Sequence, residues 1–198
     1  MIHGLWDNHH AFDCLINELN SLNISVFAPD LKHDFGRISL IDLAVQLDEY
    51  ISSNIGENIP IDLLGFSMGG LVARIWLQNM GGDRRVGRFI SVGCPHKGTL
   101  LAQLIPPFLF RGISEMGRQS PLLLDLNSNI SKLANIECIS FFCRWDLMVL
   151  PGWQAALPIG KAFEMNVFTH KSMIINHKAI DLLVDAIIND YSKDLSVL

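Results

Sequence analysis

Short runs of β-branched and other apolar residues alternate along this chain with longer segments of helical period, and this alternation restricts the fold more than any other feature. Strands separated by amphipathic helices are typical of a parallel sheet. We therefore predict an α/β fold, a three-layer sandwich around a mostly parallel central sheet. The expected strands are residues 24–28, 59–65, 88–93, 136–143 and 163–168, and the expected helices are residues 11–22, 40–51, 68–80 and the segment around 180–188.

The length and composition favour a single domain over residues 1–198. Of the 198 residues, 49% are apolar and 18% are charged, which allows a substantial core and excludes a disordered chain. Between about residues 106 and 134 the helical period disappears in a stretch that contains Pro, Leu and Phe. We interpret this stretch as an insertion or lid-like segment over the sheet, not as a second domain.

Charge and hydropathy exclude several classes of partner and location. The formal net charge is −5 and no basic stripe is present, so we expect no nucleic-acid partner. No apolar run approaches the ~18 to 20 residues that span a bilayer. The amino terminus lacks a basic segment followed by an apolar one, so the chain as written is expected to be cytoplasmic.

The cysteines and histidines show no spacing typical of a metal site. None of the four cysteines lies in a C-x-x-C motif, and the seven histidines form no H-x-x-x-H or H-E-x-x-H motif. We expect free thiols, and the sequence indicates no cofactor. Cys138 and Cys143 lie five residues apart in one expected strand, so their side chains point to opposite faces and cannot pair.

A serine lies in a glycine-rich turn between an expected strand and an expected helix. Residues 65–69 (GFSMG) fit the pattern G-x-S-x-G, in which a serine occupies a sharp strand-to-helix turn at the carboxyl edge of a sheet. Small neighbours are needed because the strand and the helix approach closely there. We predict that Ser67 is a catalytic nucleophile, and the alternative is an ordinary turn serine.

Five segments carry motifs in a fixed order. Residues 3–6 (HGLW) have the form of a His-Gly loop after a strand, and residues 65–74 (GFSMGGLVAR) that of a nucleophile elbow with its helix. They are followed by residues 94–99 (CPHKGT), 144–151 (RWDLMVLP) and 170–174 (HKSMI). In this order the segments resemble the α/β-hydrolase superfamily, and within it compact bacterial lipases and esterases. The resemblance implies an α/β-hydrolase fold with a Ser-His-Asp triad.

Two histidines compete for the role of general base. A base must lie in a loop beyond a strand end to reach the serine. His170 directly follows the last expected strand, whereas His177 lies at the start of the final helix beside Asn176, an expected helix cap. We therefore choose His170 as the base that removes the proton of Ser67.

Several aspartates compete for the role of the acid. Asp146 follows the expected strand that ends at Cys143, and it keeps the order Ser, Asp, His that the resemblance implies. We choose Asp146, and its alternative role is that of a turn aspartate. The rejected candidates lie in the insertion or on the polar face of the final helix: Asp125, Asp181 and Asp185.

The charge that develops on the substrate oxygen needs hydrogen-bond donors. The backbone N–H of Met68, next to the nucleophile, and that of Leu5, in the His-Gly loop, are the candidates for this oxyanion hole. His3 is then a residue that shapes the loop. His96, in a Pro- and Gly-containing loop, is expected to be structural, with a catalytic role as the alternative.

An apolar stretch at residues 104–110 (LIPPFLF) indicates where an acyl chain could bind. The candidate substrate contacts are Phe108 and Phe110, with Trp153 and Leu157 beyond the acid loop, and ordinary packing is the alternative for all four. The expected partner is a small-molecule or lipid ester. A transient contact with a membrane surface stays open, and the sequence does not determine the oligomeric state.

Only Met1 and Ile2 precede the His-Gly pair, where the resemblance implies a central strand. A two-residue strand leaves a gap in the sheet and unpaired backbone groups on its neighbours. We therefore expect the N-terminal strands to be largely missing from this sequence and the natural polypeptide to begin upstream.

These features together predict a serine hydrolase that cleaves carboxylic esters, of the lipase or esterase kind. A thioesterase or acyltransferase with the same three residues is one alternative, because the triad selects an acyl carbonyl and not a leaving group. A non-catalytic lipid- or partner-binding module is another, because the first strand is so short.

Overall fold

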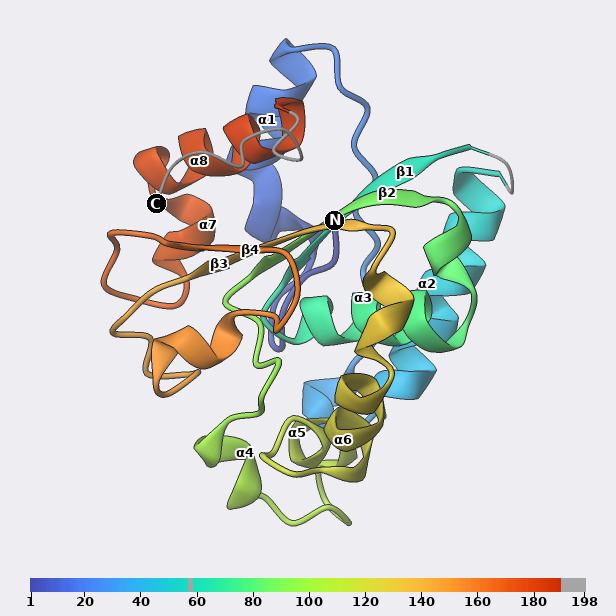
Figure 1. The fold of residues 1–198 in the computed structure, drawn as a ribbon, viewed down its shortest axis with the longest axis vertical. Coiled ribbons are helices and arrows are strands. Elements are labelled where there is room, and N and C mark those ends of the chain that lie inside the picture. The colour runs from blue at the N-terminus through green and yellow to red at the C-terminus, as the bar shows by residue number, and fades with distance from the viewer. Residues whose placement is uncertain (57–58, 190–198) are drawn as a thin grey trace.

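A computed structural model describes residues 1–56 and 59–189 and shows a parallel sheet covered by helices (Figure 1). The strands follow one another in the sheet in chain order: β1 (Ile61–Phe66), β2 (Val86–Val92), β3 (Glu137–Phe142) and β4 (Lys161–Glu164). Each neighbouring pair is parallel. All four strands therefore end at the same edge of the sheet, where their following loops meet. The predicted α/β architecture is confirmed.

Helices cover both faces of this sheet (Figure 1). On one face lie α2 (Leu40–Asn54) and α3 (Met68–Asn79). On the other face lie α1 (Asp13–Ser21), α7 (Ser172–Ile175) and α8 (His177–Ile188). Short 3-10 helices complete these layers: His9–Phe12, Asp34–Gly36, Gly82–Arg84, Ile130–Leu133 and Gly152–Ala155. Within the two described ranges, no helix is both long and apolar enough to cross a bilayer.

Residues of β1, β2 and β3 pack in two separate apolar cores, one on each face of the sheet. Leu63 of β1 and Cys138 of β3 pack in the core under α2 and α3, whereas Leu64 and Cys143 pack in the core under α1, α7 and α8. Because β1 to β3 are covered on both faces, their residues towards the carboxyl edge are almost continuously buried, whereas the residues of the edge strand β4 are partly exposed. Cys138 and Cys143 cannot pair, as predicted, and all four cysteines are free.

Two predicted strands need correction. Residues 24–28 are all described and form no strand. The neighbouring segment at Met1 gives them a single hydrogen bond, from the Met1 amino group to the Phe27 carbonyl at 2.6 Å, and one bond is no ladder. The last strand begins at Lys161 and ends at Glu164 rather than at Phe168. The Met165 N–H still donates to the Phe142 carbonyl at 2.7 Å, and after it the chain leaves the sheet.

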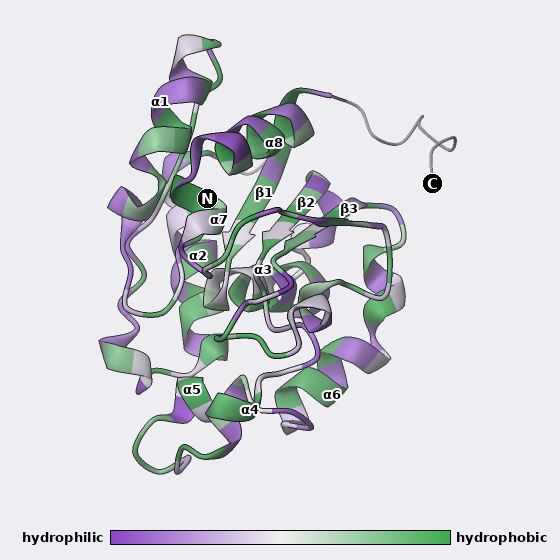
Figure 2. Ribbon diagram, turned by 90° about the vertical axis from the view of Figure 1, so that its left-hand side faces the viewer, coloured by the Kyte–Doolittle hydropathy of each residue, from purple (hydrophilic) through white to green (hydrophobic). Residues whose placement is uncertain are grey.

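The segment predicted to lack a helical period contains short helices. After α4 (Leu100–Gln103) come α5 (Arg111–Glu115) and α6 (Pro121–Ser128). Ser120 caps α6, because its hydroxyl accepts the Leu123 N–H at 3.2 Å. The three helices lie together at one end of the molecule in both ribbon views (Figure 1, Figure 2).

Beside β1, Ile2 occupies the position of a further strand but forms only an isolated bridge. Ile2 forms a parallel bridge with Gly65: its N–H donates to the Leu64 carbonyl at 2.8 Å, and its carbonyl accepts the Phe66 N–H at 2.9 Å. A groove of about 320 Å³ runs from there along β1, lined by apolar side chains of β1, α2 and the segment 24–29. This groove lies where the sequence predicts a gap in the sheet.

Buried polar side chains connect α3 to the loop after β2. Arg74 is fully buried and donates to Gln78 Oε1 and to the Leu126 carbonyl, each at 2.9 Å. Its guanidinium also donates to His96 Nδ1 at 3.5 Å, so Nε2 of this imidazole carries the proton and donates to Ser91 Oγ at 2.9 Å. His96 therefore joins the helix, the loop and the sheet from inside.

We expect Gly69→Ala to destabilise the fold strongly. A Cβ on Gly69 would lie 2.2 Å from the Ile2 carbonyl oxygen and 2.5 Å from that of His3. Overpacking of this kind costs about 1 to 3 kcal/mol, and the midpoint of thermal unfolding should fall accordingly. Gly87→Ala is the control, because its Cβ would meet only Asp62 Oδ1 at an ordinary 3.6 Å. Equal midpoints for the two variants would contradict this account.

We expect the free energy of unfolding to fall in mild acid, partly through His96. Burial, and then the charge of Arg74, hold the pKa of His96 well below its usual value. Below about pH 6.5 the unfolded chain binds a proton at this position and the folded chain does not, so stability falls by up to roughly 1.4 kcal/mol per pH unit.

Urea unfolding at a series of pH values measures this slope. His96→Gln should flatten it, because the glutamine amide does not titrate. The parent protein, unfolded in parallel under the same conditions, gives the reference slope. A slope that His96→Gln does not change would contradict the assignment.

Candidate active site

Ser67 lies at the sharp turn between β1 and α3. Its φ of 53° and ψ of −124° belong to a strained region that costs a residue other than glycine about 1 to 3 kcal/mol. Its N–H donates to the Val92 carbonyl at 2.8 Å, which fixes the turn at the carboxyl ends of β1 and β2. A Cβ on Gly65 would lie 2.5 Å from Cα of Gly70, so this close crossing of strand and helix requires glycine.

His170 lies in the loop after β4, beside the ends of β1 and β2. Its ring packs on that of Phe66, with centroids 4.8 Å apart and the planes tilted by 35°. A Cβ on Gly93, whose φ is 57°, would lie 2.9 Å from His170 Cε1. The imidazole is therefore held between the residue before Ser67 and the glycine after β2.

Asp146 lies in the loop after β3, with only 1% of its side chain exposed. Its Oδ2 is 2.6 Å from His170 Nδ1. Its Oδ1 accepts the N–H groups of Met148 at 2.8 Å and Val149 at 3.2 Å. These two main-chain bonds orient the carboxylate, so that the loops after β3 and β4 bring the predicted acid and base together.

The second ring nitrogen of His170 is available. In the neutral imidazole, Nδ1–H donates to Asp146 and Nε2 is an acceptor. Nε2 is buried and has no hydrogen-bond partner among residues 1–56 and 59–189, so the hydroxyl of Ser67 is not bonded to it. Catalytic hydrogen bonds are often long in a free enzyme and tighten around the substrate.

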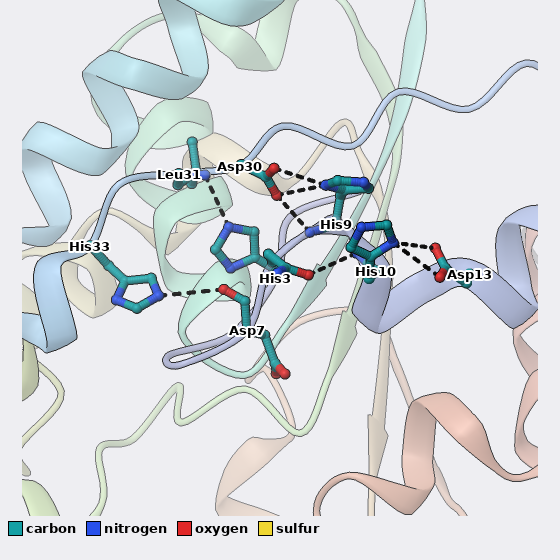
Figure 3. Close-up of polar contacts among 9 residues, drawn as sticks. His3, Asp7, His9, His10, Asp13, Asp30, Leu31 and His33 are labelled. Carbon is teal, nitrogen blue, oxygen red and sulfur yellow. Dashed lines mark hydrogen bonds and ion pairs between the residues drawn. The ribbon is translucent and has the colours of Figure 1, made fainter.

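The loop of residues 3–7 lies against Ser67. The buried His3 donates through Nδ1 to the Gly4 carbonyl at 2.9 Å. Its Nε2 accepts the Leu31 N–H, also at 2.9 Å (Figure 3). Because an amide N–H can only donate, Nε2 is unprotonated and the ring is neutral. Burial accordingly lowers the pKa of His3. A Cβ on Gly4 would lie 3.0 Å from Ser67 Cβ, which places the Leu5 amide in the segment next to the serine.

An ion pair that the sequence analysis missed joins this loop to the histidine loop. The ammonium of Lys171, the residue after His170, pairs with the carboxylate of Asp7. It also lies 5.9 Å from the centre of the Phe66 ring. Figure 3 shows the Asp7 carboxylate pointing away from the ring of His3. The two charged residues are 164 positions apart, so no local pattern could reveal their contact.

The rejected acid and base candidates have other contacts. His177 is exposed at the first position of α8, where Asn176 forms the predicted cap by accepting the N–H groups of Lys178 and Ala179. Asp125 accepts bonds from two asparagines on the outer side of α6. In the described part of the chain, no group of three or more His, Cys, Asp or Glu side chains could hold a metal ion.

The predicted substrate contacts lie in different surroundings. Phe108 is 85% exposed and Trp153 is 58% exposed. Phe110 is half-buried, with the Arg37 guanidinium 5.7 Å from its ring centre. Leu157 is buried and packs in the core under α2 and α3, which favours the alternative of ordinary packing.

Solved structures with the same fold include several hydrolases. The mature lipase BlEst2 of Bacillus licheniformis is 17% identical, with a TM-score of 0.72 over 93% of this chain and 89% of that one. Lipase B of Aspergillus fumigatus is 20% identical, with a TM-score of 0.76 over 96% of this chain and 52% of that one. A pyrethroid hydrolase of Sphingobium faniae is 13% identical, with a TM-score of 0.62 over 93% and 94%. This chain thus spans about half the length of one of these lipases and most of the other two enzymes.

Sequence comparison assigns the chain more directly. No curated protein sequence matches it. The profile of the alpha/beta hydrolase family, in contrast, matches residues 1–165, which include the turn at Ser67 and the loop of Asp146. On this match, and on the parallel sheet with its serine turn, the chain belongs to the alpha/beta hydrolase family.

Proposed function

We propose that this protein is a serine hydrolase that cleaves carboxylic esters through Ser67, His170 and Asp146. The observation that carries the proposal is the state of His170, which is bonded through Nδ1 to a buried carboxylate and keeps a buried, unpartnered Nε2. An unsatisfied buried polar atom costs about 1 to 3 kcal/mol, and functional sites retain such costs. The likeness in fold to two lipases, at 17% and 20% identity, supports the choice of an ester.

The reaction takes place in two acyl transfers. Ser67 Oγ attacks the ester carbonyl carbon while its proton moves to His170 Nε2. The tetrahedral intermediate then loses the alcohol, which takes the proton from the imidazolium, and the acyl group stays on Ser67. Water repeats the sequence, giving its proton to Nε2, and the acid leaves as Ser67 regains its hydrogen. Asp146 stabilises the imidazolium in both halves.

Main-chain amides stabilise the negative charge of each tetrahedral intermediate. Met68 is the first residue of α3, and first-turn amides have no acceptor within the helix. The Leu5 amide belongs to the loop that touches Ser67. Because these donors are held by the backbone, they need no reorganisation as the charge develops, and losing one such donor costs roughly 10² to 10³ in rate.

The segment at residues 106–134 supplies a wall for the acyl chain in this proposal. Phe108 and Phe110 lie at its beginning, and the exposed Trp153 follows the acid loop. Large exposed apolar side chains are typical of sites that bind apolar ligands or lipid surfaces. The substrate class is therefore an ester with an apolar acyl chain.

A fluorophosphonate probe should label the parent protein on Ser67. We expect no labelling of Ser67→Ala and full labelling of Ser52→Ala, which changes an exposed serine on α2. Asp146→Asn should lower kcat for nitrophenyl acetate by about 10⁴-fold, because the imidazole loses its orientation and the stabilisation of its charge. Mass spectrometry of the labelled peptide and initial rates give the two results. A folded protein that takes up no label would contradict the proposal and favour a binding module.

We expect Phe110→Ala to reduce kcat/KM for long-chain nitrophenyl esters and to leave short-chain esters nearly unchanged. The lost contact is worth about 1.5 to 3 kcal/mol, roughly a 10- to 100-fold change. Phe27→Ala, on the far side of β1, is the control. Parallel assays with acyl-CoA substrates separate esterase from thioesterase activity. Equal losses for short and long chains would remove Phe110 from the acyl site.

A further inference from the structure

We propose that Asp7 is a positioning residue of this active site, which acts through Lys171 to hold the loop of residues 3–7 against the histidine loop. The inference rests on the serine-hydrolase function proposed above. It concerns two side chains that neither bind the acyl group nor transfer its protons. Their contact joins the donor loop near the start of the chain to the base near its end.

Three parts of the site meet on the ring of Phe66, which is 1% exposed. The His170 ring packs on it at 4.8 Å, and the Lys171 ammonium lies 5.9 Å from its centre. A Cβ on Gly4 would lie 3.2 Å from Phe66 Cδ1, so the donor loop contacts the same ring. The pairing of Asp7 with Lys171 closes a ring of contacts around this buried side chain.

The loop itself has few other restraints near the serine. Trp6 has a φ of 63°, a strained conformation for a residue with a side chain, and its indole is 61% exposed. The Asp7 N–H donates to the Gly4 carbonyl at 3.3 Å, and the Asp7 carbonyl accepts from His33 Nε2 at 3.4 Å. These are long hydrogen bonds. Neither of them reaches the histidine loop, whereas the ion pair of Asp7 with Lys171 joins this turn to that loop directly.

The charges have a second consequence for the reaction. Proton transfer from Ser67 turns His170 into an imidazolium beside the cation of Lys171, and both lie against the same aromatic ring. The Asp7 carboxylate offsets the charge of Lys171 at that moment. Removing only the carboxylate thus leaves two like charges next to each other, in addition to freeing the loop.

Burial predicts a larger effect on the rate than on stability. The side chains of Asp7 and Lys171 are 21% and 43% exposed, so the pair adds little to the folding free energy. Misplacing catalytic groups by about 1 Å, in contrast, reduces rates by roughly 10- to 100-fold. A residue that only supported the fold would change the unfolding midpoint instead.

The test compares kcat and KM for nitrophenyl acetate in Asp7→Asn, Lys171→Met and the reversed pair Asp7→Lys with Lys171→Asp. We expect each single variant to lower kcat roughly 10- to 100-fold with little change in KM or in the unfolding midpoint. The reversed pair should recover most of this loss. The matched controls Asp181→Asn and Lys178→Met remove exposed charges on α8 and should keep the parent kcat.

Hydrogen exchange supplies a readout that does not depend on activity. Peptides that cover residues 3–7 should exchange faster in Asp7→Asn and Lys171→Met than in the parent, and recover protection in the reversed pair. Unchanged exchange, or a reversed pair as slow in catalysis as the single variants, would overturn the inference.

Fluorophosphonate labelling of the parent protein separates this inference from the proposed function. If the parent is labelled and hydrolyses the ester while Asp7→Asn keeps the full kcat, the inference is wrong and the proposed function stands. If the folded parent takes up no label, the proposed function fails and the inference fails with it.

Discussion

At the crossing of β1 and α3 no side chain fits between strand and helix. A Cβ on Gly65 would meet Gly70, and one on Gly69 would meet the carbonyl oxygens of Ile2 and His3. This crossing holds Ser67 in a strained backbone conformation at the end of the sheet. The strain is tolerated because the two apolar cores fix the strand and the helix on either side of the turn. Every other part of the candidate site is placed relative to this turn.

Polar groups in the interior serve two different ends. The nitrogens of Arg74 and His96 have hydrogen-bond partners on α3, on α6 and in the sheet. These bonds join α3, the loop after β2 and α6 into one rigid unit. Burial lowers the pKa of Arg74 to about 10, which still leaves it charged at neutral pH. His170 is the opposite case, because one of its nitrogens has no partner. The bonded His96 stabilises the fold, whereas in our proposal the free Nε2 of His170 accepts the proton of Ser67.

The candidate site combines loops from both ends of the chain. The donor loop comes from the first residues, the serine from the turn after β1, and the acid and base from the loops after β3 and β4. Parallel strands bring these loops to one edge, but they do not fix the side chains relative to one another. In our proposals, main-chain bonds to Asp146 orient the base, and the Asp7–Lys171 pair holds the donor loop to it. Contacts of this kind add little to the folding free energy but fix the relative positions of the side chains.

The sequence alone was sufficient to predict the strands β1 to β4 and the helices α1, α2, α3 and α8, because apolar periodicity is a local property that each segment carries by itself. It also indicated the turn at Ser67 and the loops of Asp146 and His170, since residues that follow parallel strands reach a common edge. It overextended the last strand and assigned a strand to residues 24–28, because a strand exists only where a neighbour offers a ladder of hydrogen bonds.

Only the tertiary structure could place Leu157 in the core, join Arg74 to His96 and pair Asp7 with Lys171. These contacts link residues far apart in the chain, and their formation depends on packing that no local pattern records. The same reason explains the state of His170. Its spacing in the sequence suggests a base, but the Asp146 bond and the unpartnered Nε2 arise where three separate loops meet.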